Sequence, residues 1–210
     1  INSNTSADGY KERIFTQTNS QEGRSSLDLM VMSDGERGTL QLREYSAMRK
    51  PGWEASSSDT SDECKSNVKL EDDRWYHVTI TREVEPNIVS LFVDGVRQST
   101  FIPDGSFDSD EMYIGGFADW HVAGNSSYNL NGHVADFRIT KGVNYIDDFV
   151  PSVELLTTAT SAEHPASFHF NPSNTQPISI DPDLLTFEEN EDFTIESVSY
   201  THLTLPTSKI

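Results

Sequence analysis

One segment of the sequence gathers side chains that could bind a ligand. Between residues 117 and 128, the candidate ligand-binding groups are those of Asp119, Trp120, His121, Asn125 and Tyr128. Aromatic rings can stack on the C–H faces of sugars, carboxylates and amides can hydrogen-bond to hydroxyls, and binding loops commonly lie on rigid β scaffolds. We therefore predict a ligand-binding loop here. The competing interpretation is that Trp120 and Tyr128 only cover the edge of the core.

A second segment offers oxygen ligands for a hard cation. Residues 104–111 are rich in acidic side chains, and Asp108 and Asp110 have an Asp-x-Asp spacing that suits calcium. The segment lacks the full twelve-residue pattern of the EF-hand loop. Calcium at Asp108 and Asp110 is therefore one hypothesis, and a solvated acidic loop is the other.

Catalytic arrangements of carboxylates are not evident. Glycoside hydrolysis requires two carboxylates that face one cleft, with apolar neighbours that raise the pKa of the acid. Glu83 and Glu85 precede a proline in a turn, and Asp181 and Asp183 are separated by a proline. We expect no catalytic residues and predict that the protein is not an enzyme.

Three other reactive residue types have structural interpretations. Trp75 and His77 share one face of a predicted strand, where a histidine is more often a hydrogen-bonded core residue than a ligand. Asp94 precedes Gly95, and this dipeptide suits the positive φ angles of a tight hairpin turn. Cys64 is the single cysteine and falls in a polar stretch that indicates a loop, so no internal disulfide is available.

Composition excludes several classes of partner. The chain has 15 Lys and Arg against 34 Asp and Glu, a formal net charge of −19, which argues against nucleic acid. No apolar run approaches the ~18 residues of a membrane span, so membrane insertion is not expected. A hydrophobic fraction of 35% is sufficient for a folded core.

The elements that would position these residues are strands. Apolar residues alternate with polar ones in several short runs that end in Gly, Asp, Asn or Ser, and no stretch shows helical periodicity. The predicted strands are 27–32, 39–43, 75–81, 87–93, 96–101, 112–115, 133–140 and 167–171. This pattern favours an all-β, antiparallel two-sheet sandwich.

Several of these runs together resemble a known family. Residues 75–82, 91–95, 113–116, 130–145 and 148–151 are similar, in this order, to the laminin-G-like modules of the concanavalin A-like lectin/glucanase superfamily, in the form seen in phage tail and adhesin-like proteins. The resemblance implies a concanavalin A-like jelly roll, and it implies that Asp136 and Arg138 are hydrogen-bond partners that stabilise the fold.

The resemblance also implies a function. It suggests a non-catalytic, lectin-like recognition module that binds carbohydrate or another cell-surface ligand, on the surface of a cell or virion and beside tandem modules of the same chain. Several relatives bind calcium at the rim of the sandwich, so the resemblance also suggests calcium as a cofactor. The alternatives are a purely structural spacer repeat and a remnant of a glycoside hydrolase of the same fold.

The two ends of the chain carry separate expectations. Residues 1–172 are predicted to be one jelly roll that lacks its first strand or strands, and residues 173–197 a linker and the first strand of a second, similar module. Residues 198–207 resemble translated sequencing adapter, so 198–210 is expected to be read-through on a metagenomic fragment. Either residues 193–196 or residues 178–180 are predicted to dock into the vacant strand position, with Phe193 and Ile195 pointing inward.

Overall fold

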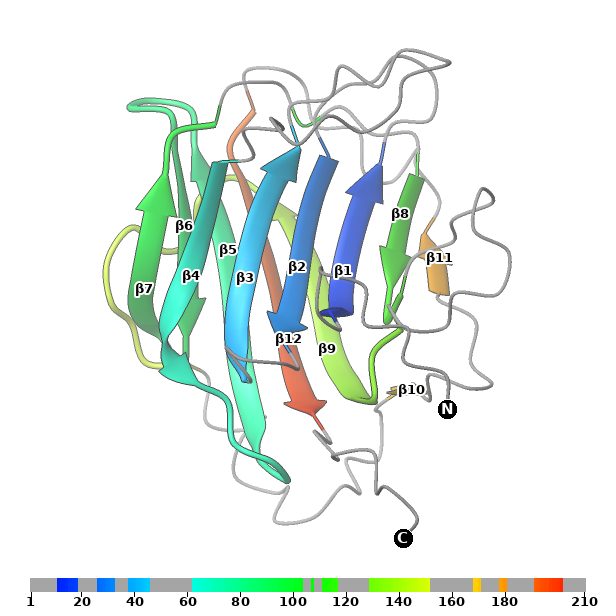
Figure 1. Cartoon of the computed structure of the whole chain (residues 1–210). Helices are drawn as coiled ribbons and strands as arrows, with labels where there is room; N and C mark the ends of the chain where they lie inside the picture. The colour runs from blue at the N-terminus through cyan, green and yellow to red at the C-terminus, as the bar shows by residue number, and fades with distance from the viewer. Residues whose placement is uncertain are drawn as a thin grey trace, which may run out of the picture.

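The structure is a computed structural model, and it describes residues 11–18, 26–32, 38–45, 62–103, 107, 111–116, 129–151, 168–170, 178–180 and 191–201. Two six-stranded antiparallel sheets pack face to face in this part of the chain (Figure 1). These residues form strands and turns without a helix, which confirms the predicted all-β, antiparallel two-sheet sandwich.

The first sheet has the order β11-β8-β1-β2-β3-β4. Its strands are β1 (Lys11–Thr18), β2 (Ser26–Met32), β3 (Thr39–Tyr45), β4 (Asp62–Lys69), β8 (Glu111–Ile114) and β11 (Ile178–Ile180). The second sheet has the order β10-β9-β12-β5-β6-β7. Its strands are β5 (Trp75–Glu83), β6 (Ile88–Val93), β7 (Val96–Phe101), β9 (Gly132–Lys141), β10 (Phe168–Phe170) and β12 (Phe193–Thr201).

Alternating side chains explain the hairpins. In β2 and β3, Leu29 lies opposite Leu42 and Val31 opposite Leu40, so all four point to the same face. Between β6 and β7 the chain turns at Asp94 and Gly95, whose φ angles of 49° and 78° are those that a tight hairpin requires. The predicted strands 27–32 and 39–43 therefore pair as a hairpin, and the predicted tight turn at Asp94-Gly95 is confirmed.

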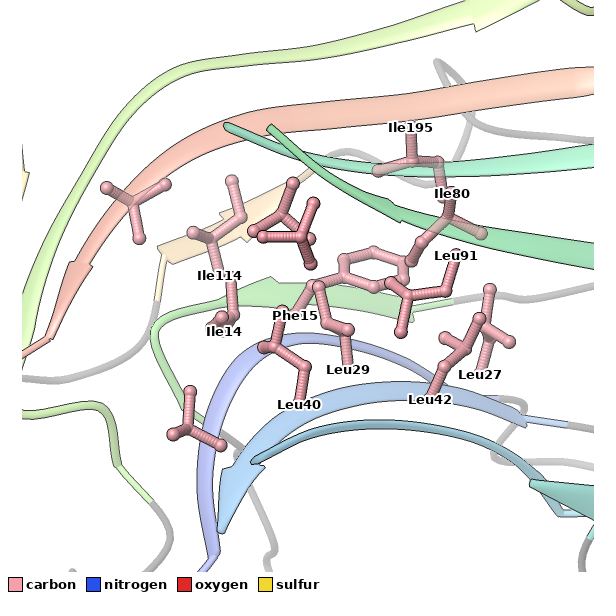
Figure 2. Close-up of a cluster of buried hydrophobic side chains, with 14 of the residues drawn as sticks. Ile14, Phe15, Leu27, Leu29, Leu40, Leu42, Ile80, Leu91, Ile114 and Ile195 are labelled. Atoms are coloured by element: carbon pink, nitrogen blue, oxygen red, sulfur yellow. The ribbon is translucent and has the colours of Figure 1, made fainter. Parts of the chain in front are cut away.

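The inward faces of the two sheets form one apolar core. Figure 2 shows leucines of β2 and β3 facing Ile80, Leu91 and Ile195 of the second sheet, with the Phe15 ring between the layers. These side chains are at most 3% exposed. Burial of this apolar surface is the main favourable contribution to the stability of the sandwich.

Two strands differ from the predictions. The segment of Cys64, predicted to be a loop, is strand β4, and Cys64 is 4% exposed in the core. The prediction was wrong because β4 is an edge strand with polar outward residues, and its pairing with β3 outweighs its weak local preference. Strand β1 was not predicted, because Ile14 and Phe15 are both buried at a register irregularity that breaks the alternation.

The last strand that the structure describes occupies an interior position. Strand β12 lies between β5 and β9 and pairs with both along its length (Figure 1). Phe193 and Ile195 point into the core, which confirms the prediction that residues 193–196 dock into the sandwich. Strand β11, the other candidate, also pairs, but at the edge of the first sheet beside β8. The assignment of residues 173–197 to a second module remains a prediction.

One side of the sandwich is closed by hydrogen bonds between the two sheets. The Gln98 Oε1 of β7 accepts from the amide N–H groups of Asn67 and Val68 in β4, both at 3.1 Å. The Asn67 side-chain amide donates to the Gln98 carbonyl, and the Ser99 hydroxyl donates to the Lys65 carbonyl. The edges of the two sheets are therefore joined here by side chains.

Candidate functional site

The residues predicted to bind a ligand or a metal fall outside the described part of the structure. This holds for the five residues Asp119, Trp120, His121, Asn125 and Tyr128, and for Asp108 and Asp110. The described residues do show where the segment 117–128 leaves the sandwich and where it returns.

The residues that flank segment 117–128 on its two sides are joined by a backbone hydrogen bond. The Gly115 amide donates to the Ile14 carbonyl of β1 at 2.9 Å, and the Leu130 amide donates to the Gly115 carbonyl at 3.0 Å. The Asn131 amide donates to the Glu12 carboxylate at 3.0 Å. Leu130 is fully buried, so the segment starts and ends on a rigid part of the core.

An apolar cavity of about 360 Å³ lies next to this anchor. It opens between β8 and β11 of the first sheet and β9 of the second, and its lining is Ile114, Val134, Ala135, Asp136, Phe137, Ile178 and Ile180. Ile114 directly precedes the anchor residue Gly115. The volume falls at the lower end of the range for small-molecule sites, and the lining combines apolar walls with one carboxylate.

The outer face of the second sheet is covered by residues 142–151, which we call the strap. Thr194 Oγ1 of β12 accepts from the Asn144 amide and donates to the Gly142 carbonyl, both at 3.0 Å. At the other end, the Phe149 amide donates to the Gly95 carbonyl at 2.9 Å. A side chain at Gly95 would collide with the strap backbone, so glycine permits this close approach.

Beneath the strap, Glu196 of β12 is the centre of a polar cluster. Its side chain is 3% exposed, and its Oε1 lies 2.8 Å from Nε of Arg138 in β9. Its Oε2 lies 3.6 Å from Nε2 of His77 in β5. Thr79 Oγ1 lies 3.3 Å from His77 Nδ1, so a tautomer with its hydrogen on Nε2 serves both neighbours. Cationic and imidazole groups thus surround a single buried carboxylate.

The strap supplies the remaining walls of this cluster. The rings of Tyr145 and Phe149 stack with centroids 3.6 Å apart, and the Phe149 ring meets His77 edge-on at 5.8 Å. Tyr145 also lies near enough to Glu196 for each group to shift the pKa of the other. The residues of this cluster therefore come from three separate parts of the sequence: β5, β9 with the strap that follows it, and β12.

Two pKa values are shifted in the cluster. The neighbouring His77 imidazole lowers the pKa of Glu196, and Arg138 lowers it further, whereas burial acts in the opposite direction. Burial raises the pKa of Tyr145, and the negative charge of Glu196 raises it further. The folded protein thus holds Glu196 ionised and Tyr145 neutral at pH 7.

The structural interpretations of the other reactive residues can now be compared with the structure. His77 is buried and hydrogen-bonded, although it lies under the strap and not between the sheets. Asp94 is a turn residue whose carboxylate accepts from the His77 amide at 2.9 Å and pairs with Arg74 at 3.0 Å. Arg138 binds Glu196, and Asp136 has a φ of 49° at an irregularity in β9.

The described residues offer little for metal or membrane chemistry. Within them, no group of three or more His, Cys, Asp or Glu residues could hold a metal ion. In the segment 104–111, the Arg82 guanidinium lies 4.9 Å over the ring of Phe107. No helix in the described ranges is long and apolar enough to cross a membrane.

Glu196 was not predicted from the sequence to belong to a polar cluster. Its alternation with Phe193 and Ile195 does predict that it points outward, but its partners come from positions far away in the chain. The strand itself carries no signal for this cluster, because four of its other eight residues are Ser or Thr.

Comparison with known proteins gives one match. The family model described as the concanavalin A-like lectin/glucanases superfamily, of laminin-G type, matches residues 4–143, two thirds of the chain. No curated protein and no solved structure was found to match significantly.

Proposed function

The chain belongs to the concanavalin A-like lectin/glucanase superfamily, and on that premise we propose that it is a non-catalytic recognition module. The proposed ligand is a carbohydrate or another component of a cell surface, and the proposed setting is a larger extracellular or virion-borne protein with neighbouring tandem modules. The binding element is the segment 117–128.

One observation carries this proposal. The segment that holds Trp120 and Tyr128 begins and ends at the hydrogen-bonded pair of Gly115 and Leu130, on a buried and rigid part of the sandwich. Binding loops are commonly supported in this way, with both ends on a rigid β scaffold. The apolar cavity beside Ile114 adds a surface that a ligand could share.

The surroundings of Glu196 support the proposal that the module is not catalytic. A general acid of a glycoside hydrolase needs a raised pKa and a second carboxylate about 5–10 Å away. The pKa of Glu196 is lowered instead, and its described partners are an arginine, a histidine and a tyrosine. This arrangement stabilises the position of β12 and does not resemble a pair of catalytic acids.

The proposal is tested by glycan-array binding of the full chain, with calcium and with a chelator present. We expect Trp120→Ala to weaken binding about tenfold or more, since aromatic contacts at binding sites contribute about 1–2 kcal/mol. Trp53→Ala, the same substitution outside the segment, is the matched control and should bind like the wild type. Loss of binding with the chelator would support the calcium site at Asp108 and Asp110.

Other outcomes favour the other functions. No binding in either condition, with Trp120→Ala silent, favours the spacer repeat. The strap favours the spacer, because it covers part of the outer face of the second sheet and leaves less of that face open to a ligand. Release of new reducing ends from any bound saccharide contradicts the non-catalytic proposal.

A further inference from the structure

Beyond ligand recognition, we propose that the gap between β5 and β9 is a strand-binding site that accepts residues 191–201 from a second copy of this chain as well as from its own. The partner is therefore another molecule with the same C-terminal strand. The two copies would exchange β12 and form a dimer in which each sandwich is complete.

The first argument is the position of β12. It is an interior strand, and it pairs with β5 through residues 193–200 and with β9 through residues 193–201. Without it, the second sheet consists of two separate parts, β10-β9 and β5-β6-β7. The site thus offers two open strand edges to one peptide, whereas a peptide that extends a sheet normally pairs with a single edge.

The second argument is that this site recognises side chains on both of its faces. On the core side, Phe193 is fully buried and its ring meets Phe107 edge-on at 5.6 Å. On the outer side, Thr194 is held by the strap, and Glu196 by Arg138 and His77. A strand of different sequence would leave a cavity or an unpaired charge, so the site selects this sequence.

A third contact extends the recognition to the residue before the strand. Asp192 Oδ1 accepts from the Val84 amide, and the Asp192 carbonyl accepts from the Gly142 amide, both at 2.7 Å. Every contact named here joins residues 191–201 to β5, β9, Phe107, the residue after β5 or the strap. None involves β11, the nearest described element before β12 in the chain.

The contacts are consequently independent of which chain supplies the strand. Residues 181–190 connect β11 to the start of the β12 region, and ten residues span at most about 35 Å when extended. Exchange of an identical element preserves all contacts and changes only this connection. A short connection gives the chain's own strand an effective concentration on the order of 1 mM. The exchanged dimer should therefore form near that concentration and become rare when the protein is dilute.

Mixed cysteine variants of the full chain test this directly. Thr81 of β5 and Thr194 of β12 lie directly opposite each other. In a Cys64→Ala background, T81C and T194C chains are unfolded together, refolded as a mixture and oxidised. A disulfide between the two variants forms only if β12 of one copy lies beside β5 of another.

The matched control replaces the donor strand. Ser90 of β6 also lies directly opposite Thr81, on the other side of β5, and it stays with its own copy in both forms. A mixture of T81C and S90C should give no linked dimer. We expect the T81C and T194C mixture to give a linked heterodimer as tens of per cent of the protein at about 1 mM and as about one per cent of it at about 10 µM.

A measurement without substitutions guards against variants that do not fold. Wild-type protein refolded at about 1 mM should elute partly as a dimer on size exclusion, and the same protein refolded at about 1 µM should elute as a monomer. The proposal is overturned if the wild type stays monomeric after refolding at the higher concentration. It is also overturned if both cysteine mixtures give the same amount of linked dimer.

Discussion

The second sheet contains two regions that were assembled in opposite ways. The strands β5, β6 and β7 follow one another along the chain and are joined by turns at residues 84–87 and at Asp94 and Gly95. Strand β12 enters the same sheet from the far end of the chain and pairs only with strands that are distant in sequence. Strands β5 and β6 are buried to the same degree as β12, so an interior position in a sheet does not depend on local connection.

The difference lies in how each region is held. The β5–β6–β7 region depends on turn geometry and apolar alternation, both of which are local properties. The β12 region adds side-chain hydrogen bonds to the strap and an ion pair between Glu196 and Arg138. Distant strands have a larger loop-closure cost, and specific polar contacts fix the register that a turn would otherwise set.

Core truncation in the two regions should give the largest effects. Phe193→Ala in β12 and Leu91→Ala in β6 each remove a fully buried side chain, and each should lower the free energy of unfolding by about 3–4 kcal/mol. Denaturant unfolding of both variants measures this. A much smaller loss for Phe193→Ala than for Leu91→Ala would show that β12 is not an integral strand of the sheet.

Removal of the charge on Glu196 should have an intermediate effect. Glu196→Gln retains the shape of the side chain and should cost about 2 kcal/mol at pH 7, the scale of a hydrogen bond to a charged group. Because the pKa of Glu196 is lowered by folding, its contribution is present above its unfolded pKa of about 4.3 and is lost as the pH falls through the folded value.

The pH series therefore sharpens the comparison. The difference in stability between the wild type and Glu196→Gln should be constant from pH 7 to about 5 and should decrease as the pH falls below about 4. Glu83→Gln, at the end of β5, provides a control substitution of the same kind. A difference that grows with acidification would contradict the assignment of Glu196 as an ionised, paired carboxylate.

The smallest expected effect concerns two serines in β12. Ser197 and Ser199 lie opposite the core residues Val78 and Tyr76, and their hydroxyls are 3.2 Å apart in a buried position. Ser197→Ala alone should cost about 1 kcal/mol because it removes the partner of Ser199. The double Ala variant should be within about 0.5 kcal/mol of the wild type, since both polar groups leave together. Additive losses would show that the hydroxyls do not pair.

The same contrast explains how far the sequence predicts this molecule. Hairpins such as β2–β3 and β6–β7 were predictable, because alternation and the Asp94-Gly95 turn are written in adjacent residues. Strand β4 was not, since its inward positions are Cys64 and Ser66 and its stability comes from pairing with β3. Residues 193–196 were predicted to dock, whereas the partners of Glu196 could not be, because Arg138, His77 and Tyr145 meet only after the strands are paired.

Residues 198–201 illustrate the difference between origin and physical role. Their sequence resembles translated adapter, yet they form the second half of β12 and place Val198 and Ser199 in buried positions. This half of β12 lies beyond the specific contacts of Phe193, Thr194 and Glu196, so compatible size and alternation suffice there. The inward serines show where apolar side chains would suit the core better.

The hydrogen bonds between β4 and β7 limit how neighbouring molecules can associate at high protein concentration. Main-chain groups at these two edges, which could otherwise recruit a foreign strand, are already occupied by Gln98, Asn67 and Ser99. The opposite margins end in β10 and β11, strands of only three residues each. Closely spaced copies are thereby prevented from merging into continuous ribbons, so any assembly they form should stop at discrete, countable units.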